Sequence, residues 1–192
     1  VGDVELDRDA RIGQRGEILD VDLATHSVQR RPNSNIGGII RSLEFLNSRF
    51  VLVSTGGLLY ESLDGESWVQ KTTFLTNPAE SSMVHGAGLY VAVGAANTIH
   101  TSPDLSAWSP RGPGYSAPAR GVTFDGSLFV SVGGTAGSVA TWSSSTDGVT
   151  WTNRAHGLSS TRALRSVAHN GAGRFCGVGE NGQIITSGNG TS

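Results

Sequence analysis

The chain is poor in the residues on which many catalytic and structural sites depend. It has one cysteine, Cys176, and one lysine, Lys71, among 192 residues, and only 16% of its residues are charged. A lone cysteine cannot form an internal disulfide, so the fold does not depend on an oxidising compartment. No Gly-Lys pair followed by Ser or Thr is present, which excludes a Walker phosphate-binding loop.

Long apolar runs are missing, and the charges nearly balance. No stretch approaches the roughly 18 apolar residues of a membrane span, and the acidic residues 1–7 predict no export signal. The 14 Lys and Arg against 16 Asp and Glu give a net charge of -2, so no basic field for nucleic acid is expected. We therefore predict neither a nucleic-acid partner nor membrane insertion.

The sequence does contain a clear internal repeat. Three segments share the pattern Ser-x-Asp-x-x-x-Trp, and a fourth stops before its tryptophan. The recurring residues are Ser62, Asp64 and Trp68; Ser102, Asp104 and Trp108; Ser145, Asp147 and Trp151; and Asn189 in the fourth segment. The acid or amide anchors are 40, 43 and 42 residues apart. Upstream of each anchor, an aromatic residue is followed three residues later by valine, as in Phe50 and Val53.

Each repeat is interpreted as short strands joined by Gly, Asn, Asp and Ser turns, because no helical period is convincing. The 27 glycines suit such turns. Four short antiparallel strands in a unit of this length are typical of a β-propeller blade. We therefore predict an all-β fold, a small β-propeller of about four blades with four antiparallel strands each. The expected blades are 36–75, 80–114, 117–155 and 161–192.

The last repeat has three predicted strands and no outer strand. Residues 16–35 resemble the second half of a blade, because Ser27-Val-Gln-Arg30 aligns with Trp68-Val-Gln-Lys71. We expect 16–35 to donate the missing strand and close the ring, since an unpaired edge invites aggregation. Pairing with the blade of another subunit, in a homo-oligomer, is the alternative. Residues 1–15 are expected to form an N-terminal extension.

The repeat resembles the Asp-box, or bacterial neuraminidase repeat, of sialidase-like β-propellers. The resemblance covers 36–192 and departs from the family pattern at Leu105, where Gly is expected, and at Asn189, where Asp is expected. Asp-box propellers occur in photosystem II assembly factors, glycan-processing enzymes and many phage virion proteins. The resemblance implies blade architecture but hardly any activity, because function lies in sites grafted on folds.

Several residues that suggest chemistry have a structural interpretation. Asp64, Asp104 and Asp147 fall one to a blade, too far apart to share a cation, so we predict that they accept backbone N–H bonds within turns. His85 and His169 take the positions of Phe45 and Phe124 in other repeats, which predicts packed strand residues. Cys176 takes a position where other repeats have valine, which predicts a small core residue.

No metal site or cofactor is predicted. His26, His100 and His156 have no partner at ligand spacing. Residues 177–182 match G-x-G-x-x-G by letter, but a strand follows where a dinucleotide site needs a helix. The glycosylation sequon at Asn189 coincides with the repeat turn and is discounted for want of an export signal.

Three arginines form the one ligand-binding candidate. Arg41, Arg120 and Arg165 each precede a recurring apolar position by two residues, and Ser81 takes that place in the second repeat. They should gather at one mouth of the central channel, where guanidiniums could hold a carboxylate, sulfate or phosphate. Interblade salt bridges are the alternative. Sialidases use an arginine cluster on this type of scaffold.

We expect no enzyme. A sialidase needs a tyrosine nucleophile with an acid partner, and the adjacent Tyr60 and Glu61 should point to opposite faces of their strand. The resemblance implies a non-enzymatic binding or structural propeller, with a phage virion component as the main hypothesis: a tail, fibre or head-surface protein. Its partners would be other virion proteins or a host receptor or glycan.

Two alternatives remain open: a bacterial assembly or chaperone factor resembling photosystem II assembly propellers, and a glycan-active sialidase-like enzyme. Location in the bacterial cytoplasm or at the cell surface is the alternative to the virion.

Overall fold

The chain folds into β-sheets that follow one another along the sequence. The computed structural model describes residues 8–12, 18–22, 27–31, 36–71, 82–94, 98–114, 117–135, 140–155 and 162–191. Within these ranges there are five antiparallel sheets, each with its strands in chain order. The prediction of an all-β fold with propeller-like antiparallel blades is confirmed. The predicted blade limits at residues 75, 80, 161 and 192 lie outside the described residues.

The N-terminal sheet consists of β1 (Arg8–Ile12), β2 (Ile18–Asp22) and β3 (Ser27–Arg31). The first blade consists of β4 (Ile40–Leu46), β5 (Arg49–Ser54), β6 (Leu59–Ser62) and β7 (Val69–Gln70). The second blade consists of β8 (Ser82–Gly86), β9 (Leu89–Val93), β10 (Ile99–Ser102) and β11 (Ser109–Arg111). The third blade consists of β12 (Ala119–Phe124), β13 (Phe129–Gly133), β14 (Thr141–Ser145) and β15 (Thr152–Asn153). The last sheet consists of β16 (Leu164–His169), β17 (Phe175–Gly179) and β18 (Ile184–Ser187).

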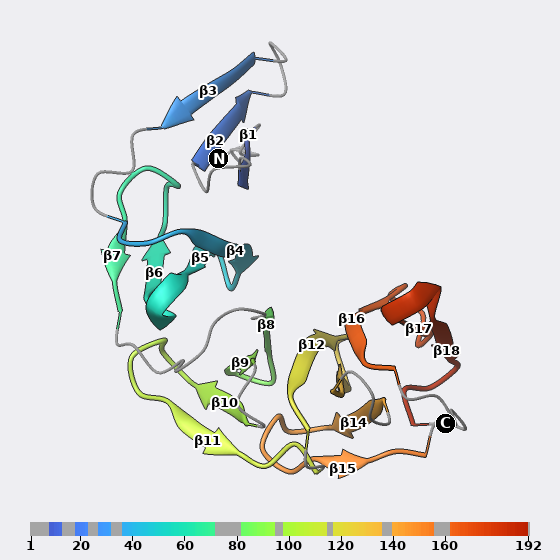
Figure 1. Ribbon diagram of the computed structural model, residues 1–192. Helices are drawn as coiled ribbons and strands as arrows, with labels where there is room; N and C mark the ends of the chain where they lie inside the picture. The colour runs from blue at the N-terminus through green and yellow to red at the C-terminus, as the bar shows by residue number, and fades with distance from the viewer. Residues whose placement is uncertain are drawn as a thin grey trace.

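The sheets are arranged in an arc (Figure 1). The first strands of the blades and of the last sheet, β4, β8, β12 and β16, lie on its inner side, and β7, β11 and β15 lie on its outer side. Each inner strand contacts the next one along the chain. Short 3-10 turns, η1 (Thr55–Gly57) and η3 (Glu180–Gly182), join the second and third strands of the first blade and of the last sheet. Among the described residues, no helix is long and apolar enough to cross a membrane.

The strand register explains why the aromatic residues recur with the serines. The aromatic at the first or second position of the second strand lies directly opposite the serine that ends the third strand, and this pairing holds in every repeat. The pairs are Phe50 with Ser62, Tyr90 with Ser102, Phe129 with Ser145, and Phe175 with Ser187. Phe129 and Ser145 are 16 positions apart in the sequence, against 12 in the other three pairs, so the additional residues of the third repeat lie between its two strands and leave the register unchanged.

The core is divided among the junctions between neighbouring blades. Because side chains alternate across a strand, Val51 and Val53 face the second blade and pack with Met83, Tyr90 and Ala92. Equivalent clusters join the second blade to the third and the third blade to the last sheet. Each blade is thus stabilised by apolar burial on its neighbour, as is typical of stacked repeats.

Ring closure by residues 16–35 is not shown. Within the described part of the chain, β2 pairs with β1 on one side and β3 on the other, and β18 is the edge of the last sheet. The interpretation missed β1 because Arg8-Asp-Ala-Arg-Ile12 is mostly polar and lies within the expected extension 1–15. Its register places Ile12 opposite Ile18, so this segment forms part of an additional sheet.

Candidate functional site

The repeat motif forms a hydrogen-bonded turn at the outer end of each third strand. In the first blade, Asp64 Oδ1 accepts the backbone N–H groups of Glu66 and Ser67, both at 2.8 Å, and the Ser62 hydroxyl at 2.9 Å. The Trp68 indole donates to the carbonyl of Gly65 at 3.2 Å. One carboxylate oxygen thus accepts three hydrogen bonds from its own turn, which gives this aspartate a structural role.

The second and third turns repeat this pattern. Asp104 accepts the N–H groups of Ser106 and Ala107 at 2.8 and 3.1 Å, and Asp147 accepts those of Val149 and Thr150 at 2.8 and 2.7 Å. The serine hydroxyls of Ser102 and Ser145 donate to the same carboxylates at 3.2 and 2.8 Å. The indoles of Trp108 and Trp151 donate to the carbonyls of Leu105 and Gly148 at 3.2 and 2.9 Å.

These bonds stabilise the ionised carboxylates. Hydrogen bonds from Ser67, Glu66 and Ser62 lower the pKa of Asp64 to about 2. Hydrogen bonds from the corresponding groups of the third turn lower the pKa of Asp147 to about 2, and the pKa of Asp104 is also lowered. The depressed pKa values here arise from local turn geometry, so they give no indication of an acid catalyst.

The last turn keeps the pattern but receives its indole from another blade. Asn189 Oδ1 accepts the N–H of Thr191 at 2.9 Å and the Ser187 hydroxyl at 3.3 Å. The carbonyl of Gly190, equivalent to that of Gly148, accepts the indole N–H of Trp142 from β14 at 2.8 Å. Sequence reasoning missed this donor because Trp142 stands outside the repeat pattern.

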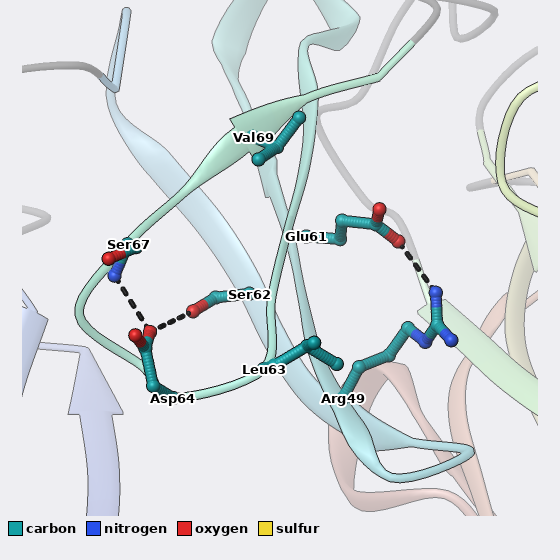
Figure 2. Close-up of a pocket in the computed structure, with 7 residues that line it drawn as sticks. All are labelled: Arg49, Glu61, Ser62, Leu63, Asp64, Ser67 and Val69. Atoms are coloured by element: carbon teal, nitrogen blue, oxygen red, sulfur yellow. Dashed lines mark hydrogen bonds and ion pairs between the residues drawn. The ribbon is translucent and has the colours of Figure 1, made fainter.

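The outer end of the first blade carries a hollow of about 300 Å³ (Figure 2). Glu61 accepts Arg49 Nη1 at 2.9 Å and Lys71 Nζ at 3.0 Å. Burial raises the pKa of Glu61, but the bonds from Lys71 and Arg49 outweigh it, so the pKa is lowered. The other blades have Thr101 and Ser144 in place of Glu61. The paired carboxylate beside the hollow is therefore particular to the first blade and is not part of the repeat.

The three predicted arginines share a backbone feature that the sequence did not reveal. The register between the first and second strands shifts by one residue at each of them: between Ile40 and Ser42, between Ala119 and Gly121, and between Leu164 and Ser166. Arg41, Arg120 and Arg165 are thus the extra residues of β-bulges on inner strands. Bulges are frequent beside functional sites because they redirect a side chain.

Arg120 and Arg165 are brought together by the close approach of β12 and β16. A Cβ added at Gly121 would lie 3.0 Å from Ser166 Cα, so a side chain there would push the two strands apart. Arg120 Nε donates to the carbonyl of Gly134 at 2.9 Å. Burial lowers the pKa of Arg120, and the charge of Arg165 lowers it further. Two cations therefore share one inner edge.

Glu180 is the acidic member of this group. One carboxylate oxygen accepts Arg165 Nη2 at 2.5 Å, and the other accepts the N–H of Ala163 at 3.4 Å. The hydrogen bond from Arg165 lowers the pKa of Glu180. Sequence reasoning missed Glu180 because it lies in the G-x-G-x-x-G stretch, whose first half belongs to β17 and whose second half, η3, connects β17 to β18. We call Arg120, Arg165 and Glu180 the inner-edge cluster.

Arg41 lies on the same inner row but apart from this cluster. It is an exposed residue of β4, and β8 lies between β4 and β12. The structure thus places two of the three predicted arginines on neighbouring strands, close enough for their charges to interact. Ser81, which takes the equivalent place in the second repeat, lies outside the described residues.

The other candidate residues have structural surroundings. His85 packs its ring against Tyr90 with centroids 4.6 Å apart, as Phe124 does against Phe129 at 4.2 Å. Cys176 is a partly buried residue of β17. The described residues hold no group of three or more His, Cys, Asp or Glu placed to bind a metal ion. His26 and His156 lie outside the described residues.

The comparisons identify similar folds. No protein-family model matches the sequence, and no curated protein matches it. A solved structure described as YCF48 bound to D1 peptide matches with a TM-score of 0.68 and 18% identity, covering 96% of this chain and 61% of that chain. YCF48 from Cyanidioschyzon merolae matches with a TM-score of 0.67 and 16% identity, covering 96% of this chain and 64% of that chain. The chain is thus similar in fold to YCF48 β-propellers and spans less than two thirds of their length.

Proposed function

We propose that this protein is a non-enzymatic binding module of the assembly-factor type, which holds an acidic segment of a partner protein at the inner-edge cluster. The observation that carries the proposal is the pair of bulged arginines, Arg120 and Arg165, held side by side at the edge of adjacent inner strands. Guanidiniums in such a pair suit carboxylates because each offers several N–H donors in a planar fork.

The fold comparison favours this role over the phage hypothesis. The similar structures are YCF48 propellers, one of them bound to a peptide, and photosystem II assembly propellers were the alternative suggested by the repeat. Nothing in the comparisons supports a virion component. A virion location therefore stays a prediction from the family resemblance alone.

The surroundings of Tyr60 favour binding over glycan cleavage. Its side chain is 2% exposed and packs with Ile40 and Leu52. Its hydroxyl accepts the N–H of Gly37 at 2.8 Å. Glu61, on the opposite face of the strand, is paired with Arg49 and Lys71. A sialidase-like nucleophile would need an accessible hydroxyl beside an acid, which these two residues do not provide.

The binding role is tested with a labelled acidic peptide of about ten residues and its counterpart in which Asn and Gln replace every Asp and Glu. Fluorescence anisotropy should show tighter binding of the acidic peptide by about tenfold, because charge-assisted hydrogen bonds contribute about 1.5–3 kcal/mol each. The double variant Arg120→Gln/Arg165→Gln should lose this preference. Glu180→Gln should strengthen binding, because it removes the carboxylate that competes for Arg165.

Arg174→Gln is the matched control, because Arg174 is an exposed arginine of the last sheet beyond the far end of β16. It should bind both peptides as the unaltered protein does. Equal affinity for the two peptides, or an unchanged preference in the double variant, would contradict the proposal. If Glu180→Gln weakens binding, the arginines serve as structural salt-bridge partners instead.

A further inference from the structure

The last sheet has an uncovered apolar face. Ala168, Cys176, Val178 and Ile184 lie on the side of the sheet that points away from the third blade, because their register partners share a face. Val178 and Ile184 lie opposite each other and are 41% and 68% exposed. We call these four residues the open face.

The equivalent positions in the other three repeats are buried. Each is a pair formed by the last apolar residue of the second strand and its register partner on the third strand. The pairs are Val53 with Leu59, Val93 with Ile99, and Val132 with Trp142. All six residues are between 0% and 3% exposed. The open face therefore differs from its counterparts in being uncovered, while its apolar character is the same.

The buried counterparts show what covers such a face. At each junction the next sheet contributes an apolar residue from its inner strand and an aromatic residue from its second strand. These covering residues are Met83 and Tyr90, Val122 and Phe129, and Val167 and Phe175. The same contact thus occurs three times within this chain, with the same elements in the same order.

We propose that the open face binds a further β-blade of the same repeat type, which presents an apolar inner-strand residue and a second-strand aromatic. The proposal rests on the fold and not on the proposed function. Exposed Val178 and Ile184 favour association because burial would remove their apolar surface from water. The match covers 61% and 64% of the solved YCF48 chains, so those chains contain further residues outside the shared arc.

The test supplies such a blade by repeating residues 151–192 after Ser192. Because Asp147 and Asn189 are equivalent, this extension continues the repeat in phase and carries copies of Leu164, Val167 and Phe175. Valine replaces the copied cysteine, so Cys176 stays the single thiol. Ile184→Ser should leave the Tm of the 192-residue chain nearly unchanged and lower that of the extended chain by about 5–15 °C.

Ile99→Ser is the matched control, because Ile99 is the buried counterpart of Ile184. It should lower the Tm by about 5–15 °C in both chains. A second extension with serine at the copies of Val167 and Phe175 should abolish the added cost of Ile184→Ser. The reaction of Cys176 with a thiol reagent gives an independent measurement and should slow by about tenfold or more when a blade covers the face.

The proposal is overturned if the extension leaves the thiol reaction rate of Cys176 unchanged, or if Ile184→Ser costs the same in both chains. Sedimentation of the 192-residue chain tests another occupant. A dimer that Ile184→Glu dissociates would show that a second copy covers the open face and would likewise overturn the proposal.

Discussion

The turn of the third blade and the turn of the last sheet share a serine hydroxyl bond, a backbone N–H bond and an indole bond, but the indole comes from different places. In the third blade, Trp151 donates to the carbonyl of Gly148 three residues away. In the last sheet, Trp142 donates to the carbonyl of Gly190, 48 residues away. The same backbone acceptor is thus satisfied once within the repeat and once across a junction between sheets.

This difference shows that the turn carbonyl needs an indole donor, but that the indole does not have to come from the same repeat. A buried carbonyl without a donor costs about 1–3 kcal/mol, so an indole must reach it from somewhere. The hydrogen bond of a local indole stays within its own turn, although the Trp151 ring also packs with residues of the second blade. An indole from the neighbouring blade also ties the two sheets together, so the last sheet depends on the third blade for more than apolar contact.

Removing the long-range donor should have the largest effect. Trp142 is 3% exposed and packs at the junction with Leu164 and Phe175. Trp142→Phe leaves the Gly190 carbonyl without its donor and removes buried volume, so it should cost about 2–4 kcal/mol in urea unfolding. Amide exchange in β17 and β18 should accelerate.

Trp151→Phe is the matched variant with the local donor. It should accelerate exchange in its own turn, in β15 and at the junction with the second blade, and leave exchange in β17 and β18 nearly unchanged. The same exchange pattern in both variants would mean that the long-range bond does not tie the last sheet to the third blade.

The second turn tests whether the packing of a buried side chain can compensate for an unfavourable left-handed backbone conformation. Leu105 has φ 65°, where the equivalent Gly65, Gly148 and Gly190 have φ of 73° to 75°. Leu105→Gly relieves left-handed strain of about 1–2 kcal/mol. It also removes a side chain that is 0% exposed between the first two blades, at a cost of about 2–5 kcal/mol. Packing should win, with a net loss of about 1–3 kcal/mol. A gain in Tm would show that the strain dominates.

The smallest effect should come from the anchor itself. The pKa of Asp147 is lowered to about 2 from an ordinary 3.8, so its contribution to stability is present above about pH 4 and is lost as the pH falls through about 2. Asn189 does not titrate. Asp147→Asn should lose about 0.5 kcal/mol at pH 7, since solvent screens an exposed carboxylate and Asn accepts the same N–H groups.

Urea titrations at pH 7, 4 and 2 check this, with Asn189→Asp as the reciprocal variant. The unaltered protein and the Asp147→Asn variant should become equally stable at low pH. The Asn189→Asp variant should have a free energy of unfolding that depends more strongly on pH. A stability difference at Asp147 that is independent of pH would assign the effect to packing.

The sequence predicts local features of this fold well and contacts between sheets poorly. The recurring positions of Phe129 and Ser145 predict a pair of strands, because the short sequence distance between them suits two strands joined by a hairpin. Trp142 and Glu180 carry no repeated signal, since their partners depend on how the blades stack. The bulges at Arg120 and Arg165 change the register without changing the residue pattern, so only the backbone reveals them.

The indole of Trp142 also has an optical consequence. Three of the four tryptophans belong to repeat turns, and Trp142 alone lies at the junction between the third blade and the last sheet. A chain that keeps only Trp142 would therefore fluoresce from a single known place. Its emission would shift to the red when the last sheet separates from the third blade.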